Sequence, residues 1–268
     1  MFQITILFLY IIAGLSLALS RLPHFSRYYR SLVTNALIFG VIAVVWHGIS
    51  LRSMILLPDG ITLSLGNTAS FIGLLLALTA LVISIQPMLR GLASGMLALA
   101  GIAAVFTGWA AAPPADTAVT WQIEAHILIS LFAYGLLTVG AIVAVYAVVQ
   151  DQRLRAGRLS PVNQLFAPLE TNERLLYGIA AAGFLALLLA VFSGFVFVDD
   201  LFAQHLVHKT VLSLLALLLF GILLAGRQFA GWRGRRAVSL YLWGFVTLGL
   251  AYFGSRYILE QLLGRTWT

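Results

Sequence analysis

The sequence predicts an all-α membrane protein: a polytopic bundle of eight transmembrane helices with both termini periplasmic. Of the 268 residues, 61% are hydrophobic and only 9% are charged. A soluble domain of this length needs more charged groups than that to cover its exterior. The apolar residues also form long uninterrupted runs, which favour helices over the alternating pattern of a membrane β-barrel.

Eight apolar segments are long enough to cross a bilayer as helices. We place them at about residues 3–20, 31–51, 67–85, 88–108, 123–149, 175–197, 205–226 and 237–259. The first span follows only Met1, Phe2 and Gln3, with no basic residue, so we interpret it as a retained anchor rather than a cleaved signal peptide. The sequence therefore predicts one transmembrane domain over residues 1–268.

Basic residues are divided unevenly between the two sides of the predicted bundle. Twelve arginines lie in one set of loops, and the other set holds Arg52, Lys209, Arg256 and Arg265. The positive-inside rule places the arginine-rich loops in the cytoplasm and both termini outside it. This bias also accounts for the net charge of +7 without a nucleic-acid partner.

Several kinds of chemistry are excluded by what the chain lacks. It has no cysteine, which excludes disulfides, thiolate metal sites and covalent haem attachment through its own thiols. It has no GxSxG, HExxH or GxxxxGK[ST] motif and no GxGxxG opening a helix. We therefore predict that the protein is not an enzyme.

Four of the five histidines lie near the predicted external ends of spans. His47 lies in the second span, His126 begins the fifth, and His205 and His208 begin the seventh. Each one alone is readily explained as an interfacial residue that hydrogen-bonds to water or to a loop carbonyl. Lys209 changes the balance, because an amine at that depth needs an anionic partner. Together these residues indicate a ligand site.

Two ligands suit this set of side chains. Histidines from different helices are common axial ligands of haem iron, and a haem propionate could pair with Lys209 or Arg52. A divalent metal ion is the alternative, because imidazole and carboxylate ligands suit zinc, nickel or cobalt. Carboxylates predicted on the same side are Asp199, Asp200 and Glu124. The spacing of the residues does not separate the two ligands.

Two other segments carry positive charge or small residues. The segment GWRGRR, with Trp232, Arg233, Arg235 and Arg236, follows the seventh span, and we predict that it anchors the chain against anionic lipid. The fourth span carries a GxxxG pattern at Gly91 and Gly95, which we attribute to packing inside the bundle rather than to a dimer interface.

Several stretches together match the pattern of one family of membrane proteins. They are VVWHGIS at 44–50, GNTAS at 66–70, HILISLFAYGLLTVGAIVAVYAVVQDQRL at 126–154, PLETNERLLYG at 168–178, FVDDLFAQHLVHKTVLS at 197–213, GWRGRRAV at 231–238 and LAYFGSRYILE at 250–260. With these stretches the chain resembles the HemX/YpjD branch of the cytochrome c assembly (CcsA-like) inner-membrane proteins. The resemblance is most specific after about residue 120 and implies a multi-pass protein of the bacterial inner membrane.

The resemblance also implies a role for the histidines. In cytochrome c assembly members, a pair of periplasmic-side histidines ligates haem beside a tryptophan-rich WxWDPKE segment, and His126 matches the first of those histidines. This chain departs from the pattern at DDLFAQHLVHK, which contains no tryptophan. There, Lys209 matches the lysine of the family segment, and His205 and His208 are additional.

The leading hypothesis is a non-enzymatic haem-binding protein acting in haem handling or cytochrome c assembly. Haem b would be held by His126 and His208 as axial ligands, with His47 and His205 as alternates and Lys209 beside a propionate. One alternative is an accessory or component of divalent cation (magnesium or cobalt) transport or resistance. Another is a structural partner protein that acts through GWRGRR and the cytoplasmic loop at about 150–174. The expected partners are the lipid bilayer, haem and other membrane proteins.

Overall fold

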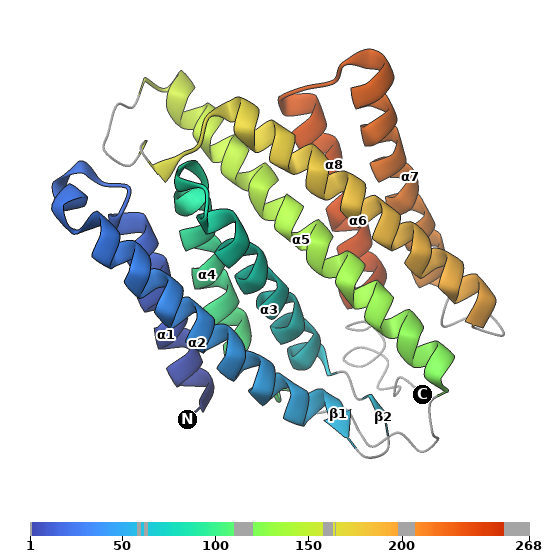
Figure 1. The fold of residues 1–268 in the computed structure, drawn as a ribbon. Helices are drawn as coiled ribbons and strands as arrows, with labels where there is room; N and C mark the ends of the chain where they lie inside the picture. Colours follow the sequence, from blue (N-terminus) through green and yellow to red (C-terminus); the bar gives the residue numbers. More distant parts are fainter. Residues whose placement is uncertain are drawn as a thin grey trace. The chain divides into compact units, whose positions relative to one another are not determined.

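The computed structural model describes residues 2–57, 60–61, 64–109, 120–157, 163, 165–197 and 207–254, and nearly all of these residues are helical (Figure 1). In the first half the helices are α1 (Phe2–Leu19), the 3-10 helix η1 (Pro23–Tyr28), α2 (Tyr29–Ile55), α3 (Leu65–Ser84), the 3-10 helix η2 (Pro87–Leu89) and α4 (Arg90–Val105). In the second half they are α5 (Trp121–Arg155), α6 (Leu169–Phe197), α7 (Val207–Ala230), α8 (Arg235–Gly249) and the π-helical segment η4 (Leu250–Gly254). Between α2 and α3, β1 (Leu56–Leu57) pairs antiparallel with β2 (Gly60–Ile61).

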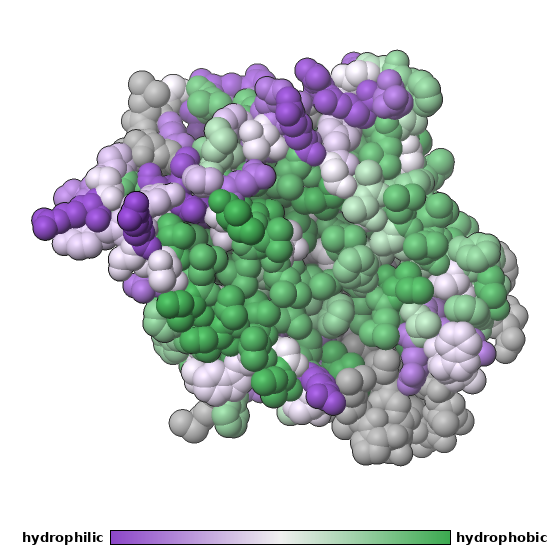
Figure 2. Space-filling view, in the orientation of Figure 1, coloured by the Kyte–Doolittle hydropathy of each residue, from purple (hydrophilic) through white to green (hydrophobic). Residues whose placement is uncertain are grey.

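Seven helical segments of the described chain are long and apolar enough to cross a membrane. They comprise α1, α3, α5, α6 and α7, together with α2 and α4 when each is joined to its preceding 3-10 turn. This confirms the predicted all-α membrane fold. The eighth helix, α8, has 15 residues and is continued by η4 to Gly254, and the rest of the predicted span 237–259 lies outside the described residues. Figure 2 shows apolar side chains covering most of the surface in view, as expected for helices that face lipid.

Two helices extend further than their apolar segments predict. The last turns of α5 include Gln150 to Arg155, and α6 begins at Leu169 instead of about residue 175. Both extensions carry an exposed ion pair at i,i+4 spacing, Asp151 with Arg155 at 2.9 Å and Glu170 with Arg174 at 2.7 Å. Such pairs stabilise a helix in water, which a search for apolar runs does not detect. The predicted 150–174 loop is therefore shorter in the structure.

The chain divides into two compact units, and the first comprises Met1–Pro114 and Val145–Arg174. In this unit α1 packs against α2 and α4, and α3 packs against α4. The connector between α5 and α6 is held by side chains of α5: Tyr146 donates through its hydroxyl to the Leu165 carbonyl at 2.5 Å, and Gln150 donates to the Ala167 carbonyl at 2.7 Å.

The two glycines of the GxxxG pattern have different surroundings in the first unit. A Cβ on Gly91 would lie 1.9 Å from the Leu165 carbonyl oxygen, so only glycine allows the connector to approach α4 here. A Cβ on Gly95 would have no neighbour within 4 Å. The pattern therefore combines one packing residue with one open position in the described chain.

The second unit comprises Ala115–Ala144 and Leu175–Thr268. In this unit α7 packs against α8, and two tyrosines tie α8 and α5 together. The buried Tyr241 of α8 donates to the Leu137 carbonyl of α5 at 3.0 Å, and Tyr134 of α5 donates to the Leu248 carbonyl of α8 at 3.2 Å. These bonds satisfy phenolic hydroxyls in an apolar setting, where an unpaired hydroxyl would be costly.

Candidate functional site

The first candidate residue, His126, lies in the second turn of α5 and packs against α6. Its Nδ1 is 2.9 Å from Oγ of Ser193, and the Ser193 hydroxyl in turn donates to the Ala190 carbonyl at 2.9 Å. Gly194 lets the ring approach α6, since a Cβ there would lie 3.1 Å from Cε1 of His126. The imidazole is thus half-buried and fixed by one residue of the neighbouring helix.

These bonds favour one position for the proton on the His126 ring. A serine hydroxyl has a single hydrogen, and Ser193 uses it on the Ala190 carbonyl. Its oxygen therefore accepts from Nδ1–H of His126, and the lone pair of the neutral ring lies on Nε2. Nε2 is thus the ring nitrogen that the bond to Ser193 leaves as an acceptor. A histidine that donates through one nitrogen and presents the other is arranged as a metal ligand is.

Lys209 is the second predicted residue found near His126. It lies in the first turn of α7, is half-buried, and acts electrostatically on His126. The structure therefore brings together a neutral imidazole lone pair and an amine on α5 and α7 of the second unit. A ligand with both a metal centre and an acidic group matches this pair.

The other predicted ligands of this region are placed less directly. His208 precedes Lys209 in α7, and its side chain is exposed. Glu124 lies in the first turn of α5. His205, Asp199 and Asp200 lie outside the described residues. In the part of the chain that the structure covers, no three histidine or acidic side chains gather as a metal cluster would require.

His47 lies in the first unit, where its ring is fully buried and both of its nitrogens are engaged. Nδ1 is 3.2 Å from the Tyr10 hydroxyl, and Nε2 is 2.7 Å from the Ser70 hydroxyl. Ser70 is 2.6 Å from Oγ1 of Thr107, which donates to the Ala104 carbonyl at 2.7 Å. These contacts connect α1, α2, α3 and the turn that follows α4.

The direction of each hydrogen bond in this series follows from Thr107, its last side chain. Because Thr107 donates to a carbonyl, its oxygen accepts from Ser70, whose oxygen then accepts from Nε2–H of His47. Nδ1 is left as an acceptor for the Tyr10 hydroxyl. In this arrangement the neutral His47 ring has no lone pair left for a ligand, which favours a structural role over the ligand role predicted from its position.

The basic segment after α7 is folded against the end of that helix. The Trp232 ring covers Gly226, where a Cβ would lie 2.2 Å from its Cε3. The Trp232 carbonyl accepts from the Tyr177 hydroxyl at 2.6 Å and from Arg227 at 3.4 Å. The predicted lipid-binding residues Arg233, Arg235 and Arg236 are all exposed, and Trp232 is half-buried.

Four side chains of these networks were not predicted as site residues: Tyr10, Ser70, Thr107 and Ser193. Each is a hydroxyl-bearing residue within or at the end of an apolar span. A buried hydroxyl in a membrane helix needs a partner, and this requirement is the signal that could have selected them. The sequence does not show which histidine each of them would contact.

Comparison with known proteins gives one family. Residues 34–263 match the family model described as "Cytochrome C assembly protein". The inner membrane protein YpjD of Escherichia coli K12 is 34% identical over 240 residues, which cover 85% of this chain and 87% of that protein. An uncharacterised 28.8 kDa protein of Azospirillum brasilense is 31% identical over 53% of each chain. The cytochrome c biogenesis protein CcsA of Gloeobacter violaceus is 27% identical over 37% of this chain and 30% of its own. No solved structure matches.

Proposed function

Because this chain belongs to the cytochrome c assembly protein family, we propose that it handles haem in the bacterial inner membrane and that His126 is a ligand to the haem iron. The names of two relatives, an inner membrane protein and a cytochrome c biogenesis protein, support the location and the pathway. The observation that carries the proposal is the lone pair on Nε2 of His126, which the bond from Nδ1 to Ser193 leaves available.

Haem b fits the residues on α5 and α7. With no cysteine in the chain, attachment is by coordination alone. His126 supplies an imidazole, Lys209 supplies a cation for a propionate, and His208 beside Lys209 is the proposed second ligand. His205 remains an alternate. Haem contributes a redox-active iron and two carboxylates when bound, and the protein's own residues bind and orient it without catalysing a reaction.

Absorbance of the purified protein tests the proposal. The full chain is purified in detergent, haem is supplied, and unbound haem is removed before the spectrum is recorded. We expect a Soret band that is strongly reduced in His126→Ala and in His208→Ala, and that added imidazole partly restores in His126→Ala. His24→Ala is the matched control, because His24 is exposed in η1. The absence of a Soret band in the unaltered protein would remove the proposal.

Metal analysis of the same preparation separates the divalent-cation alternative from haem binding. If haem is the ligand, we expect no zinc, cobalt or nickel in stoichiometric amounts beyond background. Suppose instead that the unaltered protein shows no Soret band but holds a stoichiometric divalent metal, and that His126→Ala loses this metal. The ligand of His126 would then be a metal ion and not haem.

A further inference from the structure

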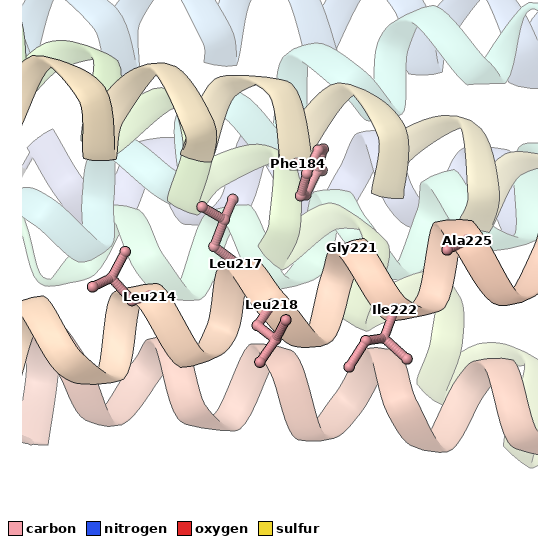
Figure 3. A pocket seen from close by; sticks show the side chains of 7 residues that line it. All are labelled: Phe184, Leu214, Leu217, Leu218, Gly221, Ile222 and Ala225. Atoms are coloured by element: carbon pink, nitrogen blue, oxygen red, sulfur yellow. The ribbon is translucent and has the colours of Figure 1, made fainter.

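An apolar groove runs between α6 and α7 in the second unit (Figure 3). Phe184 of α6 forms one wall, and one face of α7 from Leu214 to Ala225 forms the other. Its volume is about 490 Å³, and every labelled side chain in the view is hydrocarbon. Leu218 and Ile222 on its rim are 57% and 40% exposed, so the groove opens outward from the unit to where lipid would lie.

The length and depth of the groove suit one hydrocarbon chain. Leu214 and Ala225 are eleven positions apart in α7, which is about 16 Å along a helix. This is roughly half of a 30 Å hydrocarbon core, and therefore about one leaflet. Gly221 deepens the groove: a Cβ there would lie 3.5 Å from Cε2 of Phe184, so a larger side chain would fill the space.

The groove ends beside a cluster of arginines. Arg227 follows Ala225 by two positions, with its guanidinium 4.7 Å from the Tyr177 ring centroid and bonded to the Trp232 carbonyl. Beyond it, Arg233, Arg235 and Arg236 all have exposed side chains.

These arginines have no ion pair with an acidic side chain among the described residues of the second unit. The only carboxylate among its described residues is Glu124, at the start of α5, whereas the cluster lies at the end of α7. Two ion pairs on the described helices, Asp151 with Arg155 and Glu170 with Arg174, belong to the first unit. The cluster is therefore a concentrated positive charge at one end of an apolar groove.

We propose that the groove and the arginine cluster form a binding site for one anionic phospholipid. An acyl chain lies along α7 against Phe184 and Gly221, and the lipid phosphate lies among the arginines. Guanidinium groups bind phosphate through paired hydrogen bonds, and the leaflet predicted on this side, the cytoplasmic one, is rich in anionic lipid. The site is at the opposite end of α7 from Lys209, so its test is independent of haem binding.

Lipid retention by the full chain in detergent tests the site. The protein is mixed with dioleoyl phosphatidylglycerol or dioleoyl phosphatidylcholine, and bound lipids are counted by native mass spectrometry. We expect phosphatidylglycerol to be retained at least about fivefold better, the effect of roughly one basic residue at a membrane surface. Replacing Arg233, Arg235 and Arg236 together by Gln should abolish this preference. Arg52→Gln, at an exposed arginine near the other end of a span, should preserve it.

A glycine substitution tests the groove itself. Gly221→Leu should reduce phosphatidylglycerol retention several-fold, whereas Gly95→Leu, which adds the same side chain in open space on α4, should not. Equal retention of the two lipids by the unaltered protein, or unchanged retention in Gly221→Leu, would overturn the proposal.

A competition experiment covers the case in which Gly221→Leu fails to fold. Dihexanoyl phosphatidylglycerol has the same headgroup but chains too short to fill the groove, so we expect it to displace the dioleoyl lipid poorly. If the short-chain lipid displaced the bound lipid as well as added dioleoyl phosphatidylglycerol does, the site would bind only the headgroup, and the proposed acyl groove would be overturned.

Discussion

His47 and His126 lie in different units, and they differ in burial and in the number of ring nitrogens that a side chain engages. Each is an imidazole on a membrane-spanning helix that bonds to a serine of a neighbouring helix, Ser70 at 2.7 Å and Ser193 at 2.9 Å. His47 also accepts from Tyr10, whereas Nε2 of His126 has no such partner in the described chain. The number of engaged nitrogens, and not the presence of a histidine, separates a core residue from a candidate ligand.

The difference extends to the position of the proton. His47 carries it on Nε2 and His126 carries it on Nδ1, because their serines point their own hydrogens at Thr107 and at the Ala190 carbonyl. The helix that supplies the serine thus selects the tautomer. To give His47 the proton position of His126, or the reverse, the neighbouring serine and its own acceptor would have to change.

The largest effect on stability is expected from His47→Ala. The substitution leaves the Tyr10 and Ser70 hydroxyls with no ring to bond and opens a cavity among buried helices, at a combined cost of about 3–5 kcal/mol. Thermal unfolding in detergent should show a clearly lower midpoint, while haem retention by the protein that remains folded stays unchanged. A lost Soret band in folded His47→Ala protein would contradict the structural role.

His126→Ala is expected to show the opposite pattern. Haem retention should fall by more than about tenfold, because the proposed ligand itself is removed. The unfolding midpoint should change little, since the ring is half-buried and its side-chain hydrogen bond to Ser193 is worth about 1 kcal/mol. Haem titration and thermal unfolding on the same sample check both halves. A large loss of stability with haem retention intact would show that His126, like His47, has a structural role and is not a haem ligand.

The two serines provide a matched pair of smaller effects. Ser193→Ala removes the group that holds the proton on Nδ1 of His126, and haem affinity should fall by about tenfold or less. Ser70→Ala should leave haem affinity unchanged and lower the unfolding midpoint by an amount equivalent to about 1–2 kcal/mol. Haem titration of both variants measures the contrast, and equal affinities would show that the Ser193 bond has no part in ligand binding.

The smallest effect is expected from Tyr10→Phe, which keeps the ring and removes only the hydroxyl that donates to His47. The loss should be about 1 kcal/mol, measurable as a small decrease in the unfolding midpoint. Tyr28→Phe is the control, because Tyr28 is 57% exposed. A change larger than that of His47→Ala would mean that Tyr10 stabilises the unit by another route.

The sequence predicts the membrane helices well because apolar runs are a requirement of the bilayer. It failed at the ends of α5 and α6, where Asp151 and Glu170 pair with arginines in helix that extends beyond the apolar runs. It selected both His126 and Lys209 from their depth in the spans, and in the structure Lys209 acts electrostatically on His126. It could not distinguish His47, because the partners of that ring lie 37 and 23 positions away in other helices. Which helix faces meet is a property of packing.

The hydrogen-bonded chain through His47 ends at a backbone carbonyl, and this has a consequence for charge movement. A relay that conducts protons must be able to reverse all its donors and acceptors in turn. The Ala104 carbonyl can only accept, so the Thr107 hydroxyl has no reversed state along the same path. The row of four side chains therefore holds these helices together, and its end at the Ala104 carbonyl gives protons no reversible route along it.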